Sequence, residues 1–259
     1  MSSSRQEQPK VILKPVTSER DVPDLANINE QALEGDPMKQ WMILYLGRTE
    51  WDSTVEAITG ALTDPNYHLV KAVIPDMDDA GNEKIVGFIQ WMCGYIHLEG
   101  GYNSAQSNCK KDLEPKEVVK DVMDPASELP DELAEESSQA TSAEDKGRAR
   151  RLKKGEAQYL ETRNAYIGAI RGKKHVYIRR IMVLPEYHGQ GIGKQLLKVV
   201  TDSADEQKIV CWLFARPAGE ALYAKSGFRV VSLTELDEPE DGFVCPPGKG
   251  MMRLPQPKI

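Results

Sequence analysis

A short stretch in the last third of the chain decides the fold: residues 181–194 read IMVLPEYHGQGIGK. The apolar run from Ile181 to Leu184 is typical of a buried strand, and Pro185 ends it. Three glycines follow at alternate positions, and residues 191–204 indicate a helix rich in Leu, Lys and Val. A glycine-rich turn between strand and helix directs several backbone N–H groups to one point, where the helix dipole adds positive charge. The stretch therefore predicts a binding site for a phosphate or pyrophosphate.

Two familiar phosphate-binding patterns fail at this stretch. A P-loop requires GxxxxGK[ST], which would place glycine at His188 and Ser or Thr at Gln195. A dinucleotide-binding fingerprint requires GxGxxG, and its third glycine would fall at Lys194. Neither pattern therefore explains the glycines.

The stretch instead resembles the acetyl-CoA loop of the GNAT N-acetyltransferase superfamily, whose pattern is [RQ]-x-x-G-x-[GA]. The matching residues here are His188, Gly189, Gln190, Gly191, Ile192 and Gly193. The first position departs from the pattern, because His188 offers fewer hydrogen-bond donors than the usual Arg. A second segment, ALYAKSGF at residues 221–228, resembles the family's LYxKxGF segment after its fifth strand. The resemblance covers most of residues 11–98 and 165–254.

The rest of the chain is typical of an α/β (α+β) fold. Apolar runs predict strands at residues 11–16, 67–74, 84–96, 175–184, 209–214, 228–233 and 251–254. Helical spacing predicts helices at 21–34, 38–62, 148–170, 191–204 and 218–226. We expect residues 69–96 to form an antiparallel hairpin, and the helix at 38–62 to break near Gly47 and restart at Ser53 or Thr54. The resemblance implies the GNAT fold, with a mixed, mostly antiparallel central sheet, flanking helices and a V-shaped split between the fourth and fifth strands.

Length and composition indicate one globular domain: 259 residues, 40% hydrophobic and 28% charged. Residues 1–10 are predicted to be a flexible tail, and residues 11–259 a single N-acetyltransferase domain. A charged surface insertion is expected at about 99–160. Within it, residues 111–147 hold 12 acidic and 4 basic residues, although the whole chain carries a net charge of only −7. This acidic part is either a solvated linker or folds over the basic stretch that starts at Arg148.

Composition also argues against several function classes. No basic nucleic-acid footprint is evident, and no apolar run approaches the roughly 18 residues of a membrane helix. The 4 cysteines have no CxxC spacing and the 4 histidines are scattered, so neither a disulfide framework nor a metal is expected. No signal peptide is evident, which makes the cytoplasm the expected location. The oligomeric state stays open between monomer and homodimer.

The resemblance implies direct acetyl transfer from acetyl-CoA to an amine. In the family, the fourth strand hydrogen-bonds the pantetheine arm, a role that carries over to Ile181, Met182 and Val183. The loop up to Lys194 would hold the CoA phosphates, and Arg216 is expected near the pantetheine or the 3′-phosphate. Tyr223 matches the family tyrosine that protonates the departing thiolate. A phenol with a pKa of about 10 is protonated at neutral pH and can donate.

The general base is less constrained. Strand alternation predicts one shared face for four residues: Tyr177, Arg179, Ile181 and Val183. In melatonin-pathway relatives, histidines occupy the positions of the first two, so their role does not carry over. A water chain, His97, Glu99 or His175 is left as the candidate base.

The acceptor pocket is expected around residues 35–55, where Trp41, Tyr45 and Trp51 offer aromatic walls with few charges. This composition favours a hydrophobic or aromatic small-molecule amine. Two alternatives stay open. The acidic segment 111–147 would attract a basic peptide, as a protein lysine or N-terminal acetyltransferase requires. The second alternative is a non-catalytic acyl-CoA-binding or scaffold protein of the same fold.

Overall fold

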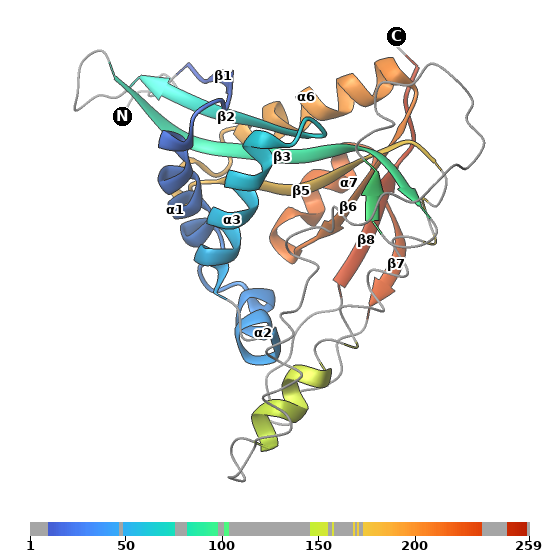
Figure 1. Cartoon of the computed structure of the whole chain (residues 1–259). Coiled ribbons are helices and arrows are strands. Elements are labelled where there is room, and N and C mark those ends of the chain that lie inside the picture. Colours follow the sequence, from blue (N-terminus) through green and yellow to red (C-terminus); the bar gives the residue numbers. More distant parts are fainter. Residues whose placement is uncertain are drawn as a thin grey trace, which may run out of the picture.

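An eight-stranded sheet with helices on both faces organises the molecule (Figure 1). The structure is a computed structural model that describes residues 10–46, 49–75, 82–97, 101–103, 146–154, 157, 168, 170, 173–234 and 248–257. The strands are β1 (Ile12–Pro15), β2 (Tyr67–Pro75), β3 (Glu83–His97), β4 (Gly101–Asn103), β5 (His175–Val183), β6 (Val210–Ala215), β7 (Arg229–Thr234) and β8 (Gly248–Arg253). Their order is β1-β2-β3-β5-β6-β8-β7, and β4 pairs with β3 off this path.

The sheet is mixed and mostly antiparallel, as predicted. β2 and β3 form the expected hairpin, with a register that runs from Tyr67 opposite Met92 to Pro75 opposite Glu83. β5 and β6 pair in parallel, whereas the other neighbouring strands of the described sheet pair antiparallel. This parallel pair is connected by a helix, as a crossover between parallel strands requires.

Helices cover the two faces of the sheet unequally (Figure 1). On one face, α1 (Val22–Ala32) and α3 (Glu50–Thr63) bury Leu25 and Ile58 against Phe88 of β3. On the other, α6 (Ile192–Gln207) buries Leu196 in a cluster with Ile89, the residue after Phe88. Successive strand residues thus feed opposite cores, which is the period-two alternation of a doubly covered sheet. Two further α-helices are α2 (Pro37–Leu46) and α7 (Glu220–Lys225).

The start of α3 differs from the prediction. The helix begins at Glu50, not at Ser53 or Thr54, because Thr49 caps it. The Thr49 hydroxyl accepts a hydrogen bond from the Asp52 N–H at 3.2 Å and donates one to its carboxylate at 2.6 Å. This reciprocal pair satisfies an N–H that the first helical turn would otherwise leave unpaired. The predicted break near Gly47 lies outside the described residues.

Two strand positions were not predicted. Residues 101–103, within the expected insertion, form β4 and pair with β3 from Tyr95 to His97. The last strand starts at Gly248, which the sequence pattern assigned to a loop. The predicted tail before Lys10 and most of the acidic segment lie outside the described residues.

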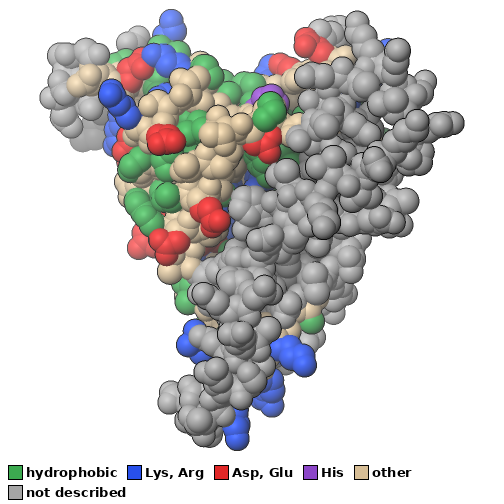
Figure 2. Space-filling model, in the orientation of Figure 1, with side chains coloured by type: hydrophobic (Ala, Val, Ile, Leu, Met, Phe, Trp, Pro, Cys, Tyr) green, Lys and Arg blue, Asp and Glu red, His purple; other side chains and the backbone are tan. Residues whose placement is uncertain are grey.

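A basic helix follows the acidic segment at residues 146–154. It carries Lys146, Arg148, Arg150, Arg151, Lys153 and Lys154. Figure 1 places this helix at the lower end of the view, beyond α2, and Figure 2 shows Lys and Arg side chains gathered at that end. Its Leu152 is buried.

Candidate functional site

The parallel strands β5 and β6 separate part-way along their length. Their pairing runs from His175 opposite Val210 to Ile178 opposite Leu213 and ends there. β5 continues to Val183, beyond the last paired residue. The two strands therefore form the V-shaped split that the resemblance predicted between the fourth and fifth strands.

A β-bulge interrupts β5 where the split begins. On β3, Gln90 pairs with Arg180 and the next residue, Trp91, pairs with Ile178. Arg179 lies between these two pairs and is the extra residue of the bulge, with no residue of β3 opposite it in the register. A bulge of this kind bends its strand and changes which side chains share a face.

The bulge overturns one prediction about the strand. Ile178 and Ile181 both pack in the core under α6, although they are three residues apart. Tyr177 packs instead with Ile170 and Trp212. Tyr177 and Ile181 are thus not on one face, because the alternation does not hold across the extra residue.

Two arginines of the bulge lie on the face covered by α1 and α3. Arg179 donates a hydrogen bond to the Tyr67 hydroxyl at 3.1 Å, with its guanidinium 5.7 Å from the centre of that ring. Arg180 donates to the Gln90 side chain at 3.0 Å, and Gln90 donates to the Ala57 carbonyl of α3. Both guanidinium groups therefore contact polar side chains on this face of the sheet.

The glycine-rich loop after β5 has the geometry of an anion cradle. Gly189 and Gly191 have φ angles of +77° and +80°, a region that side chains with a Cβ rarely adopt. Gly191 is the N-cap of α6, and Gln195 donates the first helical hydrogen bond to its carbonyl at 3.0 Å. The N–H groups of residues 192–194 thus precede the first helical bond and point out of the helix end. These amides suit a phosphate group.

Gly193 brings the loop, the split and α7 into contact. A Cβ built on Gly193 would lie 3.3 Å from Leu222 Cδ2 and 3.9 Å from Val183 Cγ2. Val183 ends β5, and Leu222 belongs to α7. The N-terminus of α6 therefore packs tightly between the end of β5 and the helix that carries Tyr223.

Tyr223 is buried on α7, with 7% of its surface exposed. Its ring meets the edge of the Phe228 ring, with 5.9 Å between the centroids. Burial raises the pKa of the phenol above its usual value, although the charge of Arg216 opposes this shift. No described residue donates to or accepts from its hydroxyl through a hydrogen bond. The phenol is thus a neutral donor at physiological pH.

A comparison with protein families decides the classification. A family model described as an acetyltransferase (GNAT) domain matches residues 111–240, which is half of the chain. The chain belongs to the GNAT acetyltransferase family. The matched residues include the split, the glycine-rich loop and Tyr223.

Individual relatives of this GNAT chain are more distant. An uncharacterized N-acetyltransferase from Schizosaccharomyces pombe is 30% identical over 84 residues, which is 32% of this chain and 36% of that protein. The match thus spans about a third of that relative's length. Arylalkylamine N-acetyltransferase 2 from Aedes aegypti is 14% identical, with a TM-score of 0.55 over 95% of this chain and 99% of that one. A mosquito arylalkylamine N-acetyltransferase like 5b is 16% identical, with a TM-score of 0.54 over 95% and 100%. At these identities the likeness to solved structures shows the fold.

His188 holds the GNAT loop to the strand that precedes it. Its Nε2 lies 2.9 Å from the carbonyl oxygen of Val183. Because a carbonyl only accepts, Nε2 carries the hydrogen and donates it. Gln190 adds a second tie, since its side chain donates to the Glu186 carbonyl at 3.3 Å. His188 thus shapes the loop from within, and its proposed contact with the CoA phosphates stays a prediction.

Arg216 has two carboxylate partners that the sequence analysis did not identify. It follows β6, and its guanidinium lies 2.8 Å from Asp36 Oδ1 and 2.7 Å from Glu50 Oε1. The predicted role at the cofactor stays a prediction for Arg216. No short-range signal could have revealed these partners, because they lie more than 160 residues away in the chain.

The candidate bases are only partly described. Glu99 and the side chain of His97 lie outside the described residues. His175 is fully buried at the start of β5 and donates from Nδ1 to the Lys173 carbonyl at 2.9 Å. Burial lowers its pKa from 6.5 to about 4, which makes it a weak base at neutral pH. The geometry thus fits a structural role for His175.

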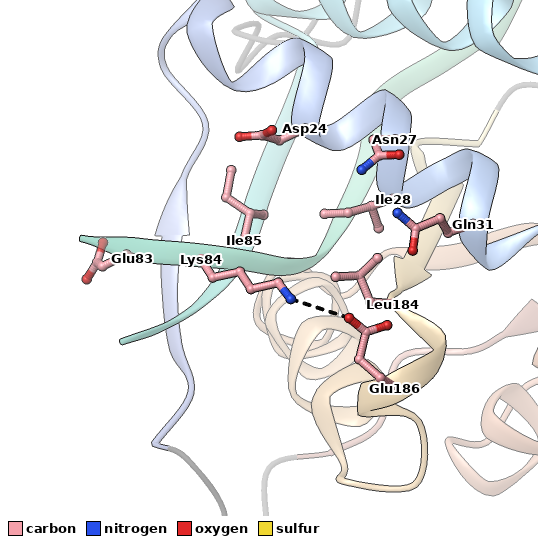
Figure 3. A pocket seen from close by; sticks show the side chains of 9 residues that line it. All are labelled: Asp24, Asn27, Ile28, Gln31, Glu83, Lys84, Ile85, Leu184 and Glu186. Carbon is pink, nitrogen blue, oxygen red and sulfur yellow. Dashed lines mark hydrogen bonds and ion pairs between the residues drawn. The ribbon is translucent and has the colours of Figure 1, made fainter. Parts of the chain in front are cut away.

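A polar pocket of about 350 Å³ lies between α1, the start of β3 and the residues after β5 (Figure 3). Lys84 extends across it to Glu186, with 3.4 Å between Nζ and Oε1, and Asp24 and Glu83 also line it. Three carboxylates and exposed amides in an open site do not resemble an acyl-CoA cleft.

The described residues contain no group of three potential metal ligands. They also contain no helix that is long and apolar enough to span a membrane.

Proposed function

We propose that this GNAT chain is an acetyl-CoA-dependent N-acetyltransferase that transfers the acetyl group directly to the amine of a small molecule. One observation carries the proposal: Gly193 packs against both Val183 of β5 and Leu222 of α7. This contact brings the start of α6 next to the end of β5 and to the helix that carries Tyr223. These three elements would supply what an acyl-CoA needs: amides for its pyrophosphate, a strand edge for its pantetheine arm and a phenol for its leaving thiolate.

The backbone supplies most of the proposed cofactor site. The N–H groups at the start of α6 would bind the pyrophosphate, with Lys194 beside them. Beyond Ile178, the edge of β5 no longer pairs with β6, so Ile181 to Val183 can pair with the amides of the pantetheine arm. The bulge at Arg179 would leave a backbone N–H near the thioester carbonyl, where an oxyanion develops.

The proposed transfer then needs one acid and one base. The neutral amine attacks the thioester carbon, forming a C–N bond and a tetrahedral oxyanion. When the C–S bond breaks, Tyr223 donates its phenolic proton to the thiolate, and a water chain removes the extra proton from the amine nitrogen. Burial raises the pKa of Tyr223, and the positive charge of Arg216 opposes this shift, so it partly stabilises the phenolate that remains. Solvent returns the proton to Tyr223 before the next turnover.

Two features support an apolar amine as the acceptor. The α2–α3 region exposes Ile43, Leu44 and Trp51, and its Trp41 is buried. The two mosquito proteins of similar fold are named arylalkylamine N-acetyltransferases, which agrees with an aromatic acceptor.

Calorimetric titration with acetyl-CoA tests the cofactor site. Wild type should bind saturably, and Gly191→Glu should not, because it places a carboxylate and a forbidden φ angle in the cradle. Gly60→Glu is the matched control, since it adds the same charge at an exposed position of α3 with no atom within 4 Å. Equal affinities of the three proteins, or no binding at millimolar ligand, would contradict the proposal.

Release of CoA with an amine panel tests the substrate class. Arylalkylamines should be turned over faster than histone-tail peptides. Faster turnover of the basic peptide would favour a protein acetyltransferase, and the acidic segment 111–147 is the feature that suits such a partner. Binding without turnover of any acceptor would favour an acyl-CoA-binding scaffold.

We also propose a cytoplasmic enzyme that acts as a monomer or homodimer, without a metal, nucleic acid or membrane partner. Size-exclusion chromatography with light scattering, and activity after treatment with a chelator, test these points. A stable higher oligomer or loss of activity in chelator would contradict them.

A further inference from the structure

Arg216 stands at a junction between the two sides of the split. It directly follows β6 and is the N-cap of the short helix η4 (Pro217–Gly219), which leads into α7. Its backbone carbonyl accepts a hydrogen bond from the Gly219 N–H at 2.9 Å. The backbone of Arg216 thus belongs to the segment that carries Tyr223.

The side chain of Arg216 contacts a different part of the molecule, the segment around α2 and the start of α3. One nitrogen of its guanidinium binds Asp36, in the loop between α1 and α2, and the other binds Glu50 in the first turn of α3. The partner side chains are only 8% and 3% exposed. Each is held further, because Asp36 accepts from the N–H of Lys39 and Glu50 lies 3.4 Å from the Asn29 amide. A planar guanidinium with two separate acceptors fixes their relative position, which a lysine cannot do.

These contacts connect the expected acceptor wall with the expected acid. Asp36 and Glu50 flank α2 in the chain, and this region exposes the apolar residues Ile43, Leu44 and Trp51. Gly219, three residues after Arg216, packs against the Tyr223 ring. A displacement of Arg216 would therefore move the acceptor wall and the tyrosine relative to each other.

We propose that Arg216 is a positioning residue that holds the α2–α3 acceptor wall in register with Tyr223 through its ion pairs with Asp36 and Glu50. This inference rests on the proposed acetyl transfer and takes the place of the cofactor contact that the family resemblance implies for Arg216. Asp36 and Glu50 have the same positioning role, because they are the ion-pair partners of Arg216. The amine, not acetyl-CoA, is the ligand whose binding depends on it.

The kinetic experiment compares Arg216→Lys with wild type. Arg216→Lys keeps the positive charge but cannot bind Asp36 and Glu50 at the same time in the geometry of the guanidinium. We therefore expect a folded protein with a changed active site. We expect the amine KM to rise and kcat to fall by roughly tenfold each, because small displacements of reacting groups are costly. The Kd for acetyl-CoA should stay within about twofold, since the contacts of Arg216 lie on the acceptor side. Lys71→Met is the matched control, because it removes a half-buried ion pair with Asp21 away from the split.

A double-mutant cycle distinguishes positioning from general stabilisation. If Arg216 acts through Tyr223, Arg216→Lys should change kcat less in a Tyr223→Phe background than in wild type. Additive effects would overturn the proposal. A loss of acetyl-CoA affinity in Arg216→Lys that is absent with 3′-dephospho-CoA would also overturn it, because Arg216 would then be a cofactor ligand.

Hydrogen exchange gives a readout that does not need turnover. In Arg216→Lys, amides of α3 and of residues 217–225 should lose protection together, and Lys71→Met should affect neither. Loss in only one of the two segments would contradict the coupling. If wild type acetylates no amine, the proposed function fails, and this measurement still decides whether Arg216 joins the two segments.

Discussion

Gly219 lies directly against the ring of Tyr223. A Cβ on Gly219 would stand 2.7 Å from Cε2, closer than real Cβ atoms approach, and 3.2 Å from the hydroxyl oxygen. The φ angle of Gly219 is −90°, which any residue can adopt, so space and not backbone conformation requires glycine here. Sequence analysis identified Tyr223 but not the residue that makes room for it.

Gly219→Ala should therefore displace Tyr223 and slow the reaction. We expect kcat to fall by roughly ten- to a hundredfold, because the proton donor moves away from the thiolate. The Kd for acetyl-CoA should change little. Steady-state CoA release and calorimetry measure the two quantities. Gly60→Ala in α3 is the control, because no atom lies within 4 Å of its Cβ, and it should leave kcat unchanged. An unchanged kcat in Gly219→Ala would contradict the role of Tyr223 as the proton donor.

The buried pair between Asp205 and Arg253 should stabilise the C-terminal half of the fold. Arg253 binds both oxygens of Asp205, at 2.7 and 2.8 Å, and its Nε donates to the Ser226 carbonyl. α6, β8 and the end of α7 are joined in this way. Asp205→Asn should lower the free energy of unfolding by about 3 kcal/mol, because it leaves a buried guanidinium without its counter-ion.

Urea denaturation measures this loss, and the exposed pair between Lys198 and Asp202 supplies the control. Its side chains are 67% and 54% exposed, so Asp202→Asn should cost no more than about 0.5 kcal/mol. Similar losses in the two variants would show that burial does not strengthen the Asp205–Arg253 pair.

Local features of the site could be predicted from the sequence, because they depend on few neighbouring residues. Gly191 begins α6 in a left-handed conformation that glycine favours, so strand, turn and helix follow from residues 181–194 alone. The hairpin of β2 and β3 likewise follows from two apolar runs separated by a polar turn. The split between β5 and β6 was predicted only through the resemblance.

Features that depend on tertiary contacts could not be predicted in this way. The bulge at Arg179 depends on the register with β3, and strict alternation therefore misplaced Tyr177 relative to Ile181. β4 is a three-residue strand, too short to show a period. The ion pairs of Arg216 join distant segments, and a lone arginine after a strand is equally compatible with a phosphate ligand.

His175 should make the protein sensitive to mild acid. Its pKa in the folded state is lowered to about 4 by burial, whereas the unfolded chain binds the proton near 6.5. Above pH 6.5 His175 is neutral in both states and does not lower the free energy of unfolding. As the pH falls from 6.5 toward 4, the unfolded chain binds a proton that the folded protein does not, so the free energy of unfolding decreases. The loss from this group should approach about 3 kcal/mol near pH 4. Urea denaturation between pH 7.5 and about 4.5 measures the slope. His175→Asn should be less stable at neutral pH and show a shallower slope; an unchanged slope would show that other groups cause it.

His188 should contribute to cofactor affinity by holding the loop and not by its charge. Removing its hydrogen bond to the Val183 carbonyl in His188→Ala frees the loop between β5 and α6. The Kd for acetyl-CoA should then rise roughly three- to tenfold, the value of one hydrogen bond. His188→Gln retains a donor of similar reach without a titratable group and should stay near wild type. Calorimetry at pH 7.5 compares the three proteins. A Gln variant as weak as the Ala variant would mean that the imidazole itself contacts the cofactor.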